Sequence, residues 1–164
     1  MAIKVGIVTV SDRAAKGYYP DQSGPALKTA VLGYNWVKMA KALVPDEAPC
    51  IQRAIREHIR HGCNLVLTTG GTGIGARDLT PEAVREIMEY ELPGFGETMR
   101  RESLKVTPHA ICSRNLAAVV DRTLVLCLPG SPTAAVECLG FVAAAIPHCL
   151  ELLRGEERGH APRP

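Results

Sequence analysis

Apolar and polar positions along the chain follow two periods, one typical of strands and one typical of helices. The β-branched run IKVGIVTV at residues 3 to 10 predicts a buried strand, because strands covered on both faces are apolar at most positions. Further strands are predicted at 64 to 69 (NLVLTT), 116 to 120 (LAAVV) and 123 to 128 (TLVLCL). The run WVKMAKALV at 36 to 44 alternates apolar and polar residues, which indicates a less buried strand.

Helical periodicity lies between these runs. Residues 49 to 60 place Ile51, Ile55 and Ile59 on one face and Arg and Glu on the other, the pattern of a helix packed by one side. We expect the last helix to bend near Pro147, because proline removes a helical hydrogen bond. The other predicted helices, with this last one, cover about 24 to 32, 81 to 90, 97 to 105 and 132 to 153.

Four strand-then-helix units in one chain predict the α/β fold class, as a three-layer sandwich with a mostly parallel central sheet. The last two strands are joined by Asp121 and Arg122, so they form a hairpin whose antiparallel pairing makes the sheet mixed. We expect a single domain over residues 1–154 and a flexible C-terminal tail over 155–164.

Composition narrows the class of protein. A chain of 164 residues with 46% hydrophobic and 22% charged residues is long enough for one domain with a full core. The N-terminus alternates like a strand and does not resemble a signal peptide, and Pro147 and His148 interrupt the longest apolar run. We therefore expect a cytoplasmic protein with no membrane segment. A net charge of +2 and 4% aromatic residues argue against nucleic acid as a partner.

Six widely spaced cysteines contain no CxxC pair, which argues against a structural zinc site. Several fall within apolar runs, where a thiol is typically a small buried hydrophobic group.

Polar residues gather where the predicted strands end. The turns read VTVSDRA, LVPDEAP, TTGGTGIGARD and CLPGSPTA, and three of the chain's five aspartates (Asp12, Asp46 and Asp78) lie in them. Ligands of open α/β sheets bind beyond the carboxyl ends of the strands. Main-chain N–H groups beside carboxylates are what a metal–polyphosphate site needs, because the amides hold phosphate oxygens and the carboxylates hold Mg²⁺.

Each of these residues also has a structural explanation. Asp and Ser favour turns and helix starts, and Thr80-Pro81 and Ser131-Pro132 are typical of an N-cap followed by an N1 proline. Asp78 lies just before such a helix start, where a negative charge is favourable in any case. The joint placement at four strand ends is what favours a ligand site.

The glycine-rich turn at 70 to 75 does not fit the common phosphate motifs. A Walker loop needs a lysine after the glycines, and none follows. The dinucleotide pattern GxGxxA is met by Gly71, Gly73 and Ala76, but the helix begins several residues late and the expected acidic residue at the next strand end is missing. The turn is therefore a phosphate loop of another type.

Several motifs together resemble a known family. The segments TTGGTGIGARDLTPEA, VTVSDRA, DQSGPAL, VPDEAP, LPGFGETMR, TPHAICSR and LPGSPTAAVEC are similar, in order and over nearly the whole chain, to the MoaB/Mog-type molybdopterin adenylyltransferases of molybdenum cofactor biosynthesis. The resemblance implies that Mg-ATP and molybdopterin give adenylylated molybdopterin and pyrophosphate. It also implies a homotrimer that hands its product to a molybdate-insertion protein.

The same resemblance assigns site residues. Asp46 and Asp78 match the family's two critical aspartates, which implies catalytic and Mg²⁺-binding or phosphate-positioning roles, directly or through water. Glu82 is a weaker member of the site, because an acid in the first turn of a helix has a structural explanation. The implied nucleotide and molybdopterin contacts are Ser11, Asp12, Arg13, Gly70, Gly71, Thr72, Gly73, Glu82, Ser131 and Pro132.

One departure and several alternatives stay open at this stage. Ala118 stands where the family often has glycine, away from the proposed phosphate groups. Arg100, Arg101 and Lys105 could meet the pterin phosphate, or could form a solvated or trimer-contact face. The alternative functions are a catalytically silent molybdopterin-binding trimer, a nicotinamide oxidoreductase and a different nucleotide reaction such as pyrophosphate hydrolysis.

Overall fold

One six-stranded sheet organises the chain in the computed structural model, which describes residues 2–155. Four strands are parallel, β5 runs antiparallel to β6, and β4 runs antiparallel to β5. The strands lie in the order β2 (Val37–Val44), β1 (Lys4–Val10), β3 (Leu65–Thr69), β6 (Thr123–Leu128), β5 (Leu116–Val120) and β4 (Tyr90–Glu91). The predicted mixed, mostly parallel sheet is confirmed, and β2 lies at an edge, which explains its alternating burial.

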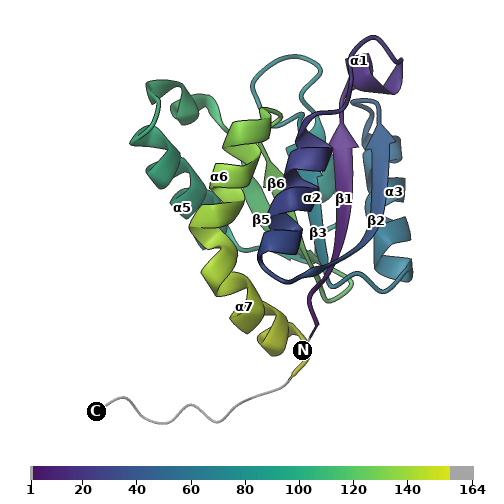
Figure 1. Cartoon of the computed structure of the whole chain (residues 1–164), viewed down its shortest axis with the longest axis vertical. Helices are drawn as coiled ribbons and strands as arrows, with labels where there is room; N and C mark the ends of the chain where they lie inside the picture. Colours follow the sequence, from purple (N-terminus) through teal and green to yellow (C-terminus); the bar gives the residue numbers. More distant parts are fainter. Residues whose placement is uncertain (1, 156–164) are drawn as a thin grey trace.

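Helices cover both faces of this sheet (Figure 1). One face is covered by α2 (Ser23–Gly33), α5 (Pro93–Leu104), α6 (Pro132–Val142) and α7 (Ile146–Leu153), whose apolar residues share a core with the sheet. The other is covered by α3 (Ala48–Arg60) and α4 (Thr80–Arg85), which share a second core with the sheet. Two cores on opposite sides of one sheet confirm the three-layer α/β sandwich. The predicted tail falls almost wholly on residues 156–164, outside the described part of the chain.

The helix predicted at 81 to 90 is wrong in its second half. Helix α4 ends at Arg85, and Tyr90 and Glu91 form the edge strand β4, opposite Val119 and Ala118. Leu92 precedes Pro93, and a residue before proline is disfavoured in helical conformation, so the chain is already extended there. Helix α5 then begins at Pro93, four residues earlier than predicted.

Two short helices and one interruption were also not predicted. Helix α1 (Asp12–Ala15) follows β1, and the 3₁₀ helix η1 (Pro108–Cys112) follows α5. The long C-terminal helix is divided by the 3₁₀ turn η2 (Ala143–Ala145), directly before the bend predicted at Pro147. Proline 147 cannot donate a main-chain hydrogen bond to residue 143, which accounts for the interruption at that place.

The C-terminal helical stretch Pro132–Leu153 is apolar and long enough to cross a membrane by length and composition alone. It is interrupted by η2, and its residues Leu139, Val142, Ile146 and Leu150 are buried in the core beside the sheet. Core helices of globular proteins pass the same test, so this stretch is accounted for by its packing on the sheet.

The cysteines are only partly the small buried groups that the sequence suggested. Cys63, Cys127 and Cys138 are buried, and complete burial raises the pKa of the Cys127 thiol to about 12. Cys112, in contrast, is exposed.

A buried histidine joins α3 to the sheet. His58 is 4% exposed, and its Nε2 lies 3.2 Å from the carbonyl oxygen of Ile7, so Nε2 carries the hydrogen and donates. Its ring occupies the space beside Gly6, where a Cβ would lie 2.5 Å from the ring carbon Cδ2. Burial lowers the pKa of His58, because the charged imidazolium is poorly solvated there.

This histidine predicts a loss of stability in mild acid. In the unfolded state His58 binds a proton near the ordinary histidine pKa of about 6.5, but in the folded state it does so only at lower pH. As the pH falls through that value, protonation therefore stabilises the unfolded state alone. The free energy of unfolding should therefore fall with decreasing pH below about 6.5, by at most about 1.4 kcal/mol per pH unit from this group. Urea unfolding at pH 7.5 and 5.5 should show a smaller decrease in His58→Gln than in the wild type. His148→Gln, at an exposed position of α7, should keep the wild-type decrease.

Candidate active site at the carboxyl edge of the sheet

Strands β1, β2, β3 and β6 are parallel, so the turns that follow them meet at one edge of the sheet, next to α1 in Figure 1. A cavity of about 340 Å³ opens at this edge. The residues predicted from the sequence that line it are Ser11, Asp46, Gly70, Gly71, Asp78 and Pro132. Four turns that are distant in the sequence therefore form one site, as the positions of the strand ends predicted.

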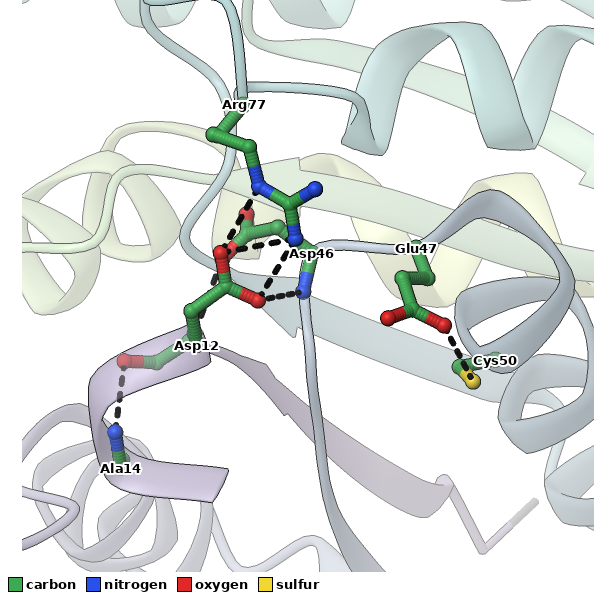
Figure 2. A network of polar contacts seen from close by, with 7 residues as sticks. Asp12, Ala14, Asp46, Glu47, Cys50 and Arg77 are labelled. Atoms are coloured by element: carbon green, nitrogen blue, oxygen red, sulfur yellow. Dashed lines mark hydrogen bonds and ion pairs between the residues drawn. The ribbon is translucent and has the colours of Figure 1, made fainter. Parts of the chain in front are cut away.

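Asp12 and Asp46 hold the first two turns together. The main-chain N–H of Asp12 donates to Oδ2 of Asp46 over 3.0 Å, and the N–H of Asp46 donates to Oδ1 of Asp12 over 3.0 Å. Arg77 donates to the same Asp12 carboxylate through Nε and Nη2, each at 2.9 Å (Figure 2). Asp12 therefore connects the ends of β1 and β2 to Arg77, which follows the glycine loop, while Asp46 lines the cavity.

The two carboxylates differ in their ionisation. Burial raises the pKa of Asp46, and the nearby negative charges of Asp12 and Asp78 raise it further, against the lowering effect of the Asp12 N–H. For Asp12, burial also raises the pKa, but the N–H of Asp46 and the guanidinium of Arg77 outweigh it and lower the pKa overall. The charges of Asp12 and Asp78 thus act on Asp46 at the cavity, and the charge of Asp46 is less compensated than that of Asp12.

The glycine loop, residues 70 to 75, packs closely against the carboxylates of Asp46 and Asp78. A Cβ on Gly71 would lie 2.9 Å from Oδ1 of Asp46, and one on Gly73 would lie 2.8 Å from Oδ2 of Asp78. The N–H of Gly75 donates to that same Asp78 oxygen over 2.7 Å. Glycine is needed at these positions because any side chain would displace a carboxylate from its place beside the loop.

Positive φ angles give the loop its shape. Gly70 has φ +100° and Gly71 has φ +65°, values that favour glycine. Thr80 closes the loop, since its Oγ1 donates to the carbonyl of Gly70 over 2.9 Å and its N–H to that of Gly71 over 3.1 Å. Within residues 2–155, no hydrogen bond uses the N–H groups of Gly71, Thr72 or Gly73. Consecutive main-chain amides of this kind suit phosphate oxygens.

Arg13, Glu82 and Ser131 are not among the residues that line this cavity, and like Ser11 they interact with other residues of the chain. Ser11 and Ser131 are the N-caps of α1 and α6, with Oγ accepting from the N–H of Ala14 and Ala134 respectively. Arg13 lies over the ring of Tyr19, with Cζ 5.0 Å from its centroid. Glu82 forms an ion pair with Arg114. Both serines therefore cap helices, as their positions in the sequence predicted. Ser11 also lines the cavity.

A second cavity, also of about 340 Å³, lies at the loop and shares Gly130 with the first. Thr72 and Gly73 line it from the loop, and Ser113 and Asn115 line it from the segment before β5. These two loop residues were predicted to contact a ligand, and the structure places them in the second cavity rather than the first.

Sequence reasoning missed several residues of the site. Asp21, Gln22 and Ser23 line the first cavity. Asp21 accepts from Oγ1 of Thr9 over 3.1 Å and from the N–H of Gly24 over 2.9 Å. The motif DQSGPAL was noted without a role, although an aspartate directly before a helix could have signalled it. Nothing in the sequence pairs Arg77 with Asp12, 65 positions away.

Fold and site together define a class: single-domain α/β proteins with a polar, carboxylate-containing cavity at the carboxyl edge of the sheet. Helix α4, which follows the glycine loop, has six residues and begins only at Thr80, which argues against a dinucleotide fold. A family model described as a probable molybdopterin binding domain matches residues 6–148. The chain belongs to this family.

Individual relatives agree with the family match. The molybdopterin adenylyltransferase of Helicobacter pylori is 43% identical over 156 residues, covering 93% of this chain and 89% of the relative. The molybdopterin adenylyltransferase of Escherichia coli K12 is 38% identical over 169 residues, covering 93% and 86%. The crystal structure of the molybdopterin biosynthesis enzyme MoaB from Thermus thermophilus superposes with a TM-score of 0.87 at 45% identity, covering 93% and 97%. These similarities confirm the resemblance inferred from the motifs.

Proposed function

We propose that this protein is a molybdopterin adenylyltransferase, a nucleotidyltransferase that transfers AMP from ATP to the phosphate of molybdopterin and releases pyrophosphate. The observation that carries the proposal is the cavity in which the glycine loop rests on Asp46 and Asp78. It is supported by relatives at 38–43% identity that carry this activity as their name. A second cavity beside the same loop is in keeping with a reaction of two substrates.

The proposed chemistry is a single displacement. An oxygen of the molybdopterin phosphate attacks the α-phosphorus of ATP, a new P–O bond forms, and the bond to the bridging oxygen of pyrophosphate breaks. No covalent enzyme intermediate is needed, so the protein contributes orientation and stabilisation of charge. The N–H groups of the glycine loop would hold phosphate oxygens. Because the loop contacts Asp46 and Asp78, both carboxylates would lie close to the bound phosphates.

Magnesium fits the residues present. Burial raises the pKa of Asp46, the negative charges of Asp12 and Asp78 raise it further, and a divalent cation would relieve this repulsion. Among the described residues, no group of three or more His, Cys, Asp or Glu side chains could hold a metal ion. Mg²⁺ is commonly bound by one or two carboxylates together with substrate phosphates and waters, which suits Asp46 and Asp78. Bound there, Mg²⁺ would neutralise charge on the phosphates.

Three further expectations belong to this proposal: a homotrimer, a cytoplasmic location and hand-over of the product to a molybdate-insertion protein. Leu104, at the end of α5, and Ile111, in η1, are exposed apolar residues, at 44% and 74%. Such residues support a contact between copies of the chain.

The test is to incubate the protein with Mg-ATP and molybdopterin and to analyse the products by mass spectrometry. We expect adenylylated pterin and pyrophosphate in equal amounts. Tight pterin binding without product would instead support the silent trimer, and consumption of ATP without adenylylated pterin would support a different nucleotide reaction.

A further inference from the structure

Arg114 is the residue that fastens the glycine loop to the rest of the fold. It lies between η1 and β5, 36 positions from Asp78, and its side chain is 31% exposed. Its main-chain N–H donates to the carbonyl of Thr72 over 2.9 Å. Nε donates to the carbonyl of Gly73 over 2.7 Å, and Nη2 donates to the carbonyl of Asp78 over 2.6 Å.

The guanidinium therefore links the main-chain carbonyl of Gly73 to that of Asp78, whose side chain is the proposed catalytic carboxylate. Arginine presents several N–H groups in one rigid plane, so one side chain can fix several acceptors at once. By holding the main chain of Asp78, Arg114 fixes the backbone from which that carboxylate extends towards Gly73 and Gly75. It also engages loop carbonyls, as Thr80 does at Gly70 and Gly71.

Arg114 is itself anchored. Its Nη1 pairs with a carboxylate oxygen of Glu82 in the first turn of α4. The next residue is held as well, because Nη1 of Arg100 on α5 donates to the carbonyl of Asn115 over 2.6 Å. Since Glu82 compensates the charge of Arg114, the guanidinium does not serve as a free cation for a phosphate.

We propose that Arg114 is a positioning residue for adenylyl transfer: it fixes the backbone of residues 72 to 78 so that Asp78 meets the reacting phosphates. Glu82 acts as the anchor of Arg114 and not as a ligand of the nucleotide. The inference rests on the proposed function. It assigns the effect of Arg114 to the planar arrangement of its N–H groups and not to its positive charge. Arg114→Gln and Arg114→Lys should therefore both lower kcat by about 10- to 100-fold, the range expected when a catalytic group is misplaced by about 1 Å.

The test combines kinetics with hydrogen exchange. Arg114→Lys keeps the charge but lacks the planar fork, so wild-type kcat in this variant would overturn the inference. Because Arg114 acts through Asp78, the loss caused by Arg114→Gln should largely disappear in an Asp78→Asn background, measured by single turnover. Two losses that multiply would contradict the inference. The KM for ATP should change less than kcat.

Hydrogen exchange separates this inference from the proposed function. In Arg114→Gln, the amides of Gly75 and Asp78, which are hydrogen-bonded within this segment, should exchange at least about tenfold faster while those of the central strands keep their protection, because only the loop loses its fastening. Arg85→Gln is the matched control, since Arg85 on α4 pairs with Glu91 and not with the loop; it should leave both readouts unchanged. If the wild type forms no product, the proposed function is wrong. The inference is then judged by exchange alone, and unchanged exchange at the amides of Gly75 and Asp78 would overturn it.

Discussion

Asp78→Asn is expected to lower kcat for adenylyl transfer by at least about 100-fold, the loss typical of removing one electrostatic contact to a transition state. The fold should survive, because an asparagine Oδ1 can still accept the hydrogen bond from the N–H of Gly75. Only the negative charge is lost, and with it the capacity to bind a cation near the phosphates. Steady-state kinetics with molybdopterin and Mg-ATP, with circular dichroism of both proteins, measure the effect.

Asp46→Asn should behave in the same way, because its amide oxygen can still accept from the N–H of Asp12. The matched control is Asp121→Asn, at the exposed tip of the β5–β6 hairpin, where φ is +47° and asparagine is well tolerated. This control should keep wild-type activity and stability. Wild-type turnover by both Asp46→Asn and Asp78→Asn would show that the carboxylates of the cavity do not take part in the reaction.

Gly70→Ala should destabilise the whole fold by about 3 kcal/mol and lower the soluble yield. A φ of +100° is unfavourable for alanine by about 1–2 kcal/mol, and crowding in a packed site adds a similar amount. The new Cβ would lie 2.2 Å from the carbonyl oxygen of Val10, a main-chain atom that cannot rotate away. The ends of β1 and β3 would have to separate. Urea unfolding monitored by circular dichroism gives the free energy of unfolding.

Gly33→Ala is the control for this substitution. Gly33 is exposed at the end of α2, and a Cβ there meets no atom within 4 Å. Its free energy of unfolding should change by no more than about 0.5 kcal/mol. Equal stability of the Gly70→Ala variant and the wild type would mean that the loop does not have the backbone conformation described.

The layers of the fold were predictable because burial determines where apolar residues lie along the sequence. Strands β1, β3 and β6 are buried at nearly every position, and the apolar runs marked them correctly. The edge strand β4 was missed, since two residues carry no period and their pairing with β5 comes from a distant part of the chain. The helix predicted across 81 to 90 failed for this reason.

The location of the site could be predicted from the sequence, but most of its hydrogen bonds and ion pairs could not. Parallel strands bring their carboxyl ends together, so Asp46, Gly70 and Asp78 could be placed at one edge of the sheet from the positions of the strand ends alone. The hydrogen bonds from Arg77 to Asp12 and from Arg114 to Asp78 could not be predicted, because they depend on the directions in which the arginine side chains extend. Glu82 was given a ligand role by family resemblance, and the structure shows its partner to be Arg114.

A crystal structure with Mg²⁺ and an ATP analogue whose α–β bridging oxygen is replaced by methylene tests the central claim most directly. The account predicts phosphate oxygens on the N–H groups of Gly71, Thr72 and Gly73. It also predicts the metal bound to Asp46 or Asp78, directly or through one water. A triphosphate bound away from the carboxyl edge of the sheet, or a metal beyond the reach of one water from both carboxylates, would contradict it.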